Sequence, residues 1–255
     1  MIAYVAKDLD SGLSLRAHDD VRLPAFSTIK VLLAAAFWRA VERGELDAAA
    51  PYDVEPGRAV GGSGVLHGFR HAASIALGDL VHLMLAVSDN EASNIVASAV
   101  GFARVNALAA ELGMGSTVMA RLMCDAQAVA SGRDNYTCAA DLATLVEELA
   151  GGERLSAGVR DSVRASLSLQ EHLDGIARYL PPGAEYAGKC GDDSPAGRYA
   201  HDFGLVCGGG ARAAVVVLSE DAGGFEAVAR TGAALFGALS DAAGGEAASA
   251  DVTAR

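Results

Sequence analysis

Ser27 and Lys30 stand three residues apart in the segment Ser27-Thr28-Ile29-Lys30. Side chains at this spacing share one face of a helix, so the ammonium of Lys30 can reach the hydroxyl of Ser27. A serine hydroxyl becomes a nucleophile when a base removes its proton, and a desolvated lysine can be that base near pH 7. The pair therefore predicts acyl transfer through a covalent serine intermediate. The alternative is a serine that caps a helix beside an unrelated lysine.

Two further motifs carry residues that suit the same chemistry. Ser88-Asp89-Asn90 falls between two expected helices, where all three residue types are also common as ordinary caps. Lys189-Cys190-Gly191 falls at the end of an expected strand, and K-x-G is a common pattern by itself. The chain has only three lysines, however, and two of them belong to these motifs. This scarcity, together with the order of the motifs, indicates one shared site.

The order S-x-x-K, S-D-N, K-x-G resembles the serine β-lactamase and penicillin-binding protein superfamily, and class A β-lactamases in particular. The resemblance covers nearly the whole chain. Residues 24–30 are similar to the segment that leads into the family's nucleophile helix, residues 79–94 to its S-D-N helix, and residues 61–66 to the loop before that helix. It implies a five-stranded antiparallel sheet flanked by terminal helices, beside an all-α lobe.

The resemblance also implies a role for each catalytic side chain. Ser27 would be the acylated nucleophile and Lys30 its activating partner. Ser88 would pass a proton to the leaving group, and Lys189 would orient Ser88 and add positive potential. These four residues are the expected catalytic set.

Substrate binding is expected at the next residues of the same motifs. By the resemblance, Asn90 would hold the substrate's amide. The oxyanion hole would combine the backbone N–H groups of Ser27 and Asp192, the residue after Gly191. Removing one such donor typically costs ~3 kcal/mol of transition-state stabilisation.

The K-x-G strand departs from the family pattern. Cys190 replaces a threonine or serine whose hydroxyl helps to bind substrate carboxylates. Asp192 and Asp193 add negative charge at the pocket mouth, which repels anionic β-lactams and favours cationic or amine-bearing substrates. Arg198 could grip a substrate carboxylate or pair with these aspartates. We expect the thiol of Cys190 to pack rather than to act as a second nucleophile.

The family's deacylation loop departs further. Class A enzymes carry a glutamate there that activates the deacylating water, and the corresponding residues 121–127 contain none. Alignment on Arg121 places Met123 at the glutamate and Gln127 at a family asparagine. Asp125 is the nearest carboxylate, and it is either a loop-stabilising group or an unusual deacylating base. Efficient β-lactam hydrolysis is therefore not expected.

The elements that must position these residues follow from hydrophobic periodicity. Residues 2–9 and 13–17 alternate as a hairpin, and residues 29–40 are apolar on all sides of a helix, which predicts burial. Further helices are expected at 79–87, 91–100, 102–112 and 139–150, strands at 184–190, 200–207 and 213–219, and an amphipathic helix after them. We predict an α/β (α+β) fold as a single catalytic domain, residues 1–243. Its α/β lobe comprises residues 1–44 and 176–243, its inserted all-α lobe comprises residues 45–175, and residues 244–255 form a flexible tail.

Composition narrows the partners of this chain of 255 residues. A net charge of -12 opposes binding to nucleic acid and to anionic membranes, and the apolar stretch 31–38 is too short to span a bilayer. Four cysteines without a C-x-x-C pair, and histidines without metal spacing, predict neither a metal site nor a disulfide framework, and no cofactor is expected. Because no leader segment precedes the first strand, a cytoplasmic location is expected.

These observations predict an acyl-serine enzyme acting on a small ester or amide. A cytoplasmic biosynthetic transacylase with an amine acceptor is favoured, together with an esterase or amidase that uses water. One alternative is a class A β-lactamase that hydrolyses β-lactams with an atypical base. Another is a sensor module that is acylated or occupied without turnover. The oligomeric state is left open.

Overall fold

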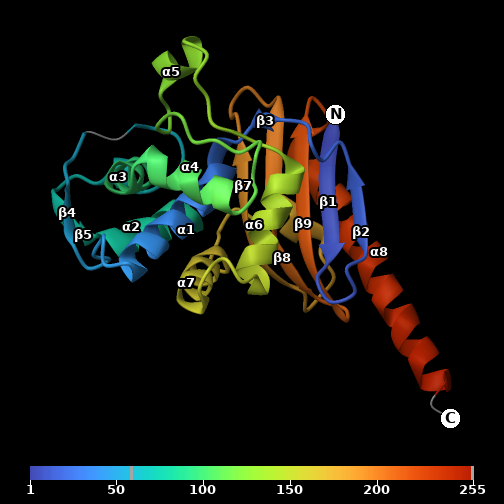
Figure 1. Cartoon of the computed structure of the whole chain (residues 1–255). Coiled ribbons are helices and arrows are strands. Elements are labelled where there is room, and N and C mark those ends of the chain that lie inside the picture. The colour runs from blue at the N-terminus through green and yellow to red at the C-terminus, as the bar shows by residue number, and fades with distance from the viewer. Residues whose placement is uncertain (58–59, 254–255) are drawn as a thin grey trace.

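The two ends of the chain meet in one antiparallel five-stranded sheet, with strands in the order β2-β1-β9-β8-β7 (Figure 1). The computed structural model describes residues 1–57 and 60–253, with side chains up to residue 244. The strands are β1 (Ile2–Asp8), β2 (Ser14–Ala17), β7 (Glu185–Asp192), β8 (Tyr199–Gly208) and β9 (Ala211–Glu220). The hairpin and the three later strands predicted from alternation are therefore confirmed, as is the α+β fold class.

The helices largely follow the predicted periodicity. They are α1 (Ile29–Glu42), α2 (Leu77–Ala86), α3 (Asn90–Val100), α4 (Phe102–Glu111), α5 (Ala126–Ala130), α6 (Ala139–Gly151), α7 (Ala157–Leu167) and α8 (Gly224–Thr253), with single turns η1 (Phe26–Thr28), η2 (Leu66–Gly68) and η3 (Ile176–Tyr179). Two short ladders join β3 (Leu23–Pro24) to β6 (Tyr136–Thr137) and β4 (Pro51–Val54) to β5 (Ala73–Ala76). The β4–β5 ladder brackets the loop of residues 61–66.

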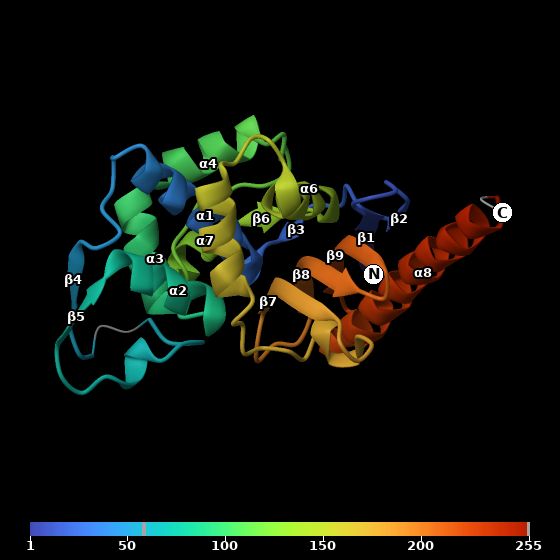
Figure 2. The same cartoon turned by 90° about the horizontal axis from the view of Figure 1, so that it is seen from below.

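Helix α1 forms the centre of the helical lobe. Its residues 29–37 are all buried, as its uniform apolarity predicts, and it packs against α2, α3, α4 and α7 (Figure 2). Helix α6 instead packs on the sheet, against β1, β8 and β9. The expected lobe boundaries at residues 44 and 176 therefore need correction, because α1 joins the helical lobe and α6 joins the sheet.

Strand β9 separates two hydrophobic layers. Its residues Ala214, Val216 and Leu218 belong to the core beneath α6 and α1, whereas Val215 and Val217 face Phe236 and the rest of α8. The period of two along a strand produces this division. In the described residues α8 is the one terminal helix on the sheet, where two were expected.

Helix α8 also continues to Thr253, so most of the segment expected to be a tail is helical. Its last turns extend beyond the sheet (Figure 1), and residues 254–255 lie outside the described residues. The flexibility of the tail stays a prediction. Among the helices of the described chain, none combines the length and the hydrophobicity that crossing a membrane requires.

Candidate active site

The three sequence motifs converge on one pocket of about 380 Å³. It is lined by Phe26, Ser27, Gly62, Ser63, Ser88, Asn90, Arg121, Met123, Cys124, His172, Cys190, Gly191, Asp192 and Ser194. Five of the expected site residues do not line the pocket. Two of them, Lys30 and Lys189, are fully buried, and the other three are Arg198, Asp125 and Gln127. The structure thus brings residues of all three motifs to one pocket and leaves these last three residues, which lie outside the motifs, away from it.

Ser27 stands in the turn η1, directly before α1, and its half-buried side chain opens on the pocket. Strand β7 passes very close to this turn. A Cβ atom at Gly191 would lie 2.7 Å from the backbone nitrogen of Ser27 and 3.1 Å from that of Thr28. Only glycine allows this approach. It places the end of the K-x-G strand beside the Ser27 N–H, where an oxyanion hole requires it.

Three residues of the pocket have strained backbones. Phe26, Ser88 and Cys124 have φ values of 47°, 57° and 60°, and they are three of the five non-glycine residues with positive φ in the described chain. Such conformations cost of order 1–3 kcal/mol each and persist where the surrounding structure holds them, often at active sites.

Lys30 connects to the nucleophile through Ser88. Its Nζ donates to the Ser88 carbonyl oxygen at 2.8 Å, to Ser88 Oγ at 3.1 Å and to Asn90 Oδ1 at 2.8 Å. Ser88 Oγ in turn lies 3.1 Å from Ser27 Oγ. The direct hydrogen bond expected between Lys30 and Ser27 is absent among the described residues, because the S-D-N turn draws the ammonium toward itself.

The environment of Lys30 suits a base. Burial holds the pKa of Lys30 well below its usual value, and the nearby charge of Lys189 lowers it further. An amine with a lowered pKa is neutral more often near pH 7 and can accept a proton. The Lys30–Ser88–Ser27 chain therefore offers a path for a proton between the nucleophile and a buried amine.

Lys189 makes different contacts from those expected. Its Nζ donates to Gln170 Oε1 at 3.2 Å and to the Cys190 carbonyl oxygen at 3.2 Å, and no hydrogen bond to Ser88 occurs among the described residues. Gln170, which the motif analysis missed, is 5% exposed, and its Nε2 has no hydrogen-bond partner in the described chain. A single glutamine in an irregular segment gives no sequence pattern that could have identified it.

The S-D-N turn acts both as a helix cap and as part of the site. Asp89 caps α3 by accepting from Ala92 N at 2.9 Å, and its other oxygen accepts from the backbone of Val65 and Leu66. Asn90 donates from Nδ2 to the Gly61 carbonyl oxygen at 3.1 Å. One oxygen of the Asp89 carboxylate thus caps α3, and the other holds the loop of residues 61–66 against the site.

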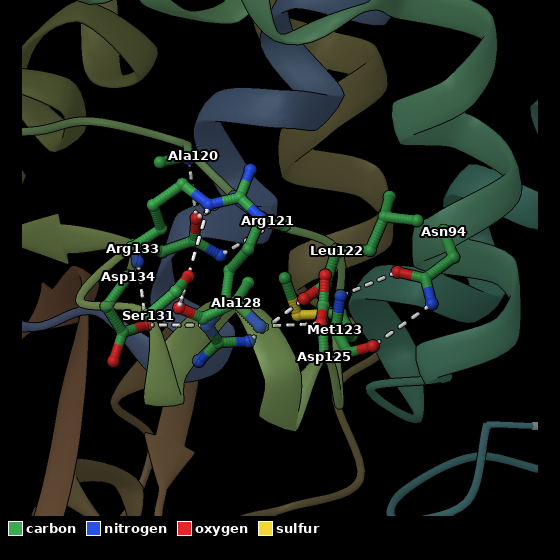
Figure 3. Close-up of polar contacts among 11 residues, drawn as sticks. Asn94, Ala120, Arg121, Leu122, Met123, Asp125, Ala128, Ser131, Arg133 and Asp134 are labelled. Atoms are coloured by element: carbon green, nitrogen blue, oxygen red, sulfur yellow. Dashed lines mark hydrogen bonds and ion pairs between the residues drawn. The ribbon is translucent and has the colours of Figure 1, made fainter.

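The expected deacylation loop places an apolar side chain in the pocket. Met123 is 6% exposed, and its backbone is held by Asn94, which accepts from Met123 N at 2.7 Å and donates to Met123 O at 3.2 Å (Figure 3). Asp125 caps α5 by accepting from Ala128 N at 2.9 Å. The structure therefore favours a loop-stabilising role for Asp125 over a deacylating one, and Gln127 is exposed outside the pocket.

The loop that carries Met123 is closed at its base. Arg121 Nε donates to Asp134 Oδ1 at 2.7 Å in a largely buried ion pair (Figure 3). Asn135 accepts from the backbone nitrogens of Ala120 and Arg121 at 2.8 and 3.0 Å. The same Asn135 accepts from Ala25 N through its carbonyl oxygen, which ties the loop to the chain before Ser27.

Both alternatives expected for Arg198 also need correction. Arg198 pairs with Glu220 at 2.7 Å and Asp221 at 3.3 Å, not with Asp192 or Asp193, because it directly precedes β8, whose first residue Tyr199 is paired with Glu220 at the end of β9. It therefore cannot grip a carboxylate held in the pocket.

The two cysteines of the pocket differ in exposure. Burial raises the pKa of Cys190 to about 11, so its thiol stays protonated, as expected for a packed side chain. The exposed free thiol in the pocket is Cys124, which the motif analysis did not single out as a site residue. Its exposure depends on the path of the loop, which no local pattern encodes.

Comparisons with known proteins agree with this geometry. Residues 2–246 match the model of the beta-lactamase enzyme family. The fold is similar to a β-lactamase from Sphaerobacter thermophilus, with a TM-score of 0.86, 27% identity and coverage of 96% of this chain and 92% of that one. It is also similar to PBP-A, with a TM-score of 0.84, 27% identity and coverage of 94% and 90%.

A curated relative gives a shorter match. The chain is 35% identical over 112 residues to the β-lactamase regulatory protein BlaB of Streptomyces cacaoi, which spans 44% of this chain and only 36% of BlaB. The family match, by contrast, extends over nearly the whole sequence and includes all three motifs. The chain belongs to the beta-lactamase enzyme family, within a superfamily of serine hydrolases.

Proposed function

We propose that this protein is an acyl-serine enzyme that takes the acyl group of a small ester or amide onto Ser27 and transfers it to an acceptor. The observation that carries the proposal is the hydrogen-bonded chain from Lys30 through Ser88 to Ser27. A purely binding module does not need a buried lysine joined to a serine pair. We propose a cytoplasmic biosynthetic role for this activity.

Acylation follows from the positions of these groups. Neutral Lys30 accepts the Ser88 proton while Ser88 Oγ accepts the proton of Ser27 Oγ, which attacks the carbonyl carbon. The N–H groups of Ser27 and Asp192 receive the negative charge on the carbonyl oxygen. As the tetrahedral intermediate collapses, Ser88 returns a proton to the leaving alcohol or amine. The products are the ester of Ser27 and the free leaving group.

Deacylation distinguishes transfer from hydrolysis. Met123 offers no group that can take a proton from water, and Asp192 is the one carboxylate among the described pocket residues. Water without a base reacts slowly with an ester. An amine is a stronger nucleophile and needs only the Ser88–Lys30 path to receive its proton. We therefore favour a transacylase with an amine acceptor over an esterase or amidase.

The second candidate is a β-lactamase with an atypical deacylation base. The similarity to the Sphaerobacter thermophilus β-lactamase over almost the whole chain favours it. A PBP-A mutant forms an acyl-enzyme complex with penicillin G, which makes β-lactam acylation of Ser27 a reasonable part of either candidate. A sensor that is acylated without turnover, suggested by the regulatory name of BlaB, is the third.

Intact-mass spectrometry separates these functions. The protein is mixed with a panel of esters, thioesters and β-lactams, with and without an amine, and the adduct mass is followed over time. A transacylase gives an adduct that is cleared faster by the amine, and a β-lactamase gives rapid turnover of β-lactams alone. A sensor gives a permanent adduct. The Ser27→Ala variant must lose the adduct, and Cys124→Ser controls for acylation of the exposed thiol.

A further inference from the structure

Among the described residues, the lysines and arginines near the pocket are engaged elsewhere. Lys189 is fully buried and donates to Gln170, and Arg198 is paired outside the pocket. Arg121 does line the pocket, but its guanidinium donates to Asp134 and to the Leu122 carbonyl oxygen. A thiol at Cys190 is a weak hydrogen-bond donor. A carboxylate bound here would therefore lose its water without gaining an ion pair to a free lysine or arginine of the described chain.

Asp192 gives the pocket a negative charge instead. It is the one carboxylate among the described pocket residues, and its side chain is half-buried. Its Oδ1 accepts from Ser194 N at 2.7 Å, and no ion pair to it occurs in the described part of the chain. Asp193, its neighbour, accepts from Tyr199 N at 2.9 Å and does not line the pocket. One pocket carboxylate thus has no cationic partner among the residues that the structure describes.

An aromatic cluster contributes Phe26 to the same pocket. The Phe26 ring packs at 5.4 Å from the Tyr199 ring and 5.7 Å from the His201 ring. His201 is paired with Gly191 across the β7–β8 ladder, and a Cβ atom at Gly191 would lie 3.2 Å from the Phe26 Cβ. Phe26 thus packs on the end of β7, and it lines the same pocket as Asp192.

A carboxylate next to an aromatic ring is a favourable site for an ammonium group. The carboxylate supplies a direct charge interaction, and the ring adds cation–π attraction that strengthens when the site is partly closed to water. His201 does not compete, because burial lowers its pKa to about 4 and keeps it neutral near pH 7. The imidazole is thus part of the cluster rather than a rival cation.

We propose that the acyl donor of this enzyme carries a positively charged ammonium group, which binds between Asp192 and Phe26 while its carbonyl group enters the oxyanion hole. The inference rests on the proposed acyl-serine function and names the substrate class for that same site. It also explains the lost hydroxyl at Cys190, since a cationic donor has no use for a carboxylate-binding group.

The test compares acyl donors that differ only in charge. They are the p-nitrophenyl esters of γ-trimethylammoniobutyrate, of its carbon isostere with a tert-butyl group, and of glutarate. The burst of p-nitrophenolate gives the acylation rate of Ser27. We expect the cationic ester to react about tenfold faster than the isostere and the glutarate ester to react slowest, with the preference reduced in about 0.5 M salt. Equal rates for the cation and the isostere would overturn the inference.

Two matched variants locate the effect. Asp192→Asn should bring the ratio of the two rates close to one, since it removes the charge and keeps the backbone N–H. Asp193→Asn changes the adjacent carboxylate outside the pocket and should leave most of the preference. Phe26→Leu should lower the ratio several-fold. A preference that persists in Asp192→Asn would contradict the assignment.

Two further readouts separate this inference from the proposed function. Acylation by p-nitrophenyl acetate, which has no charged group, tests Ser27 reactivity alone. Binding of the N-methylamides of the cationic acid and its isostere to Ser27→Ala, followed by NMR titration, tests the ammonium site without chemistry. If acetate acylates Ser27 but the cation has no advantage, only the substrate class is wrong. If no ester acylates Ser27 but the cation binds through Asp192, only the catalytic proposal is wrong.

Discussion

Replacing Met123 by glutamate should turn a long-lived acyl-enzyme into a hydrolytic one. Met123 lines the pocket, and its backbone is fixed on both sides by Asn94, so a glutamate here would project into the same space. A positioned general base contributes typically 10²–10⁴-fold to a proton-transfer step. We therefore expect Met123→Glu to hydrolyse the acyl-Ser27 ester about a hundredfold faster or more, with little change in the rate of acylation.

The substitution has a cost that can be measured separately. The methionine side chain is almost fully buried, so introducing a carboxylate should lower the free energy of unfolding by about 1–3 kcal/mol. The assay is the decay of the acyl-enzyme mass after removal of excess ester, beside urea unfolding of each variant. Met123→Gln is the matched control, because it has the same size and no base. If a folded Met123→Glu variant deacylates no faster than Met123→Gln, position 123 does not hold a side chain where it can activate the deacylating water.

The other predictions concern the proton path and two buried groups. Ser88→Ala should slow acylation about 10²–10⁴-fold by interrupting the path, as a p-nitrophenolate burst would show, whereas Ser63→Ala changes another pocket hydroxyl and should have a small effect. Gln170→Leu removes an acceptor of the fully buried Lys189 and should lower the free energy of unfolding in urea by about 1–3 kcal/mol. His201 has a folded pKa of about 4 against about 6.5 unfolded, so the unfolded state binds more protons between these values and stability falls as the pH falls from 6.5 to 4. Between pH 6.5 and pH 4, the free energy of unfolding of His201→Gln should fall by about 3 kcal/mol less than that of the wild type. Equal falls in urea titrations of the two proteins would disprove this prediction.

The sequence predicted the elements of the fold where periodicity was strong. Strand β9 is a continuous apolar run rich in valine, and α1 is apolar on every side, so both the strand and the burial of the helix were predictable. Helix α7 was missed because only a narrow stripe of its residues is buried, among them Val159, Val163 and Leu167. The lobe to which α1 and α6 belong depends on packing between distant segments, which periodicity does not encode.

The candidate site was predictable where motif residues are few and specific. Two of three lysines fell in motifs, and the pocket does collect Ser27, Ser88 and Asn90. The partners of the lysines were not predictable. Lys189 and Gln170, for example, come from separate segments that only the folded chain brings together. Arg198 was misjudged for the same reason, because the pairing of β8 with β9 decides which carboxylates lie near it.

The central claim is that Ser27 carries the acyl group and holds it. The most direct measurement is peptide mapping by mass spectrometry after exposure to p-nitrophenyl acetate, with the adduct followed over time in buffer and in buffer with an amine. We predict an acetyl group on the peptide that contains Ser27, slow loss of this group in water and faster loss with the amine. An adduct that survives unchanged in Ser27→Ala, or no adduct in the wild type under conditions where the protein is folded, would contradict it.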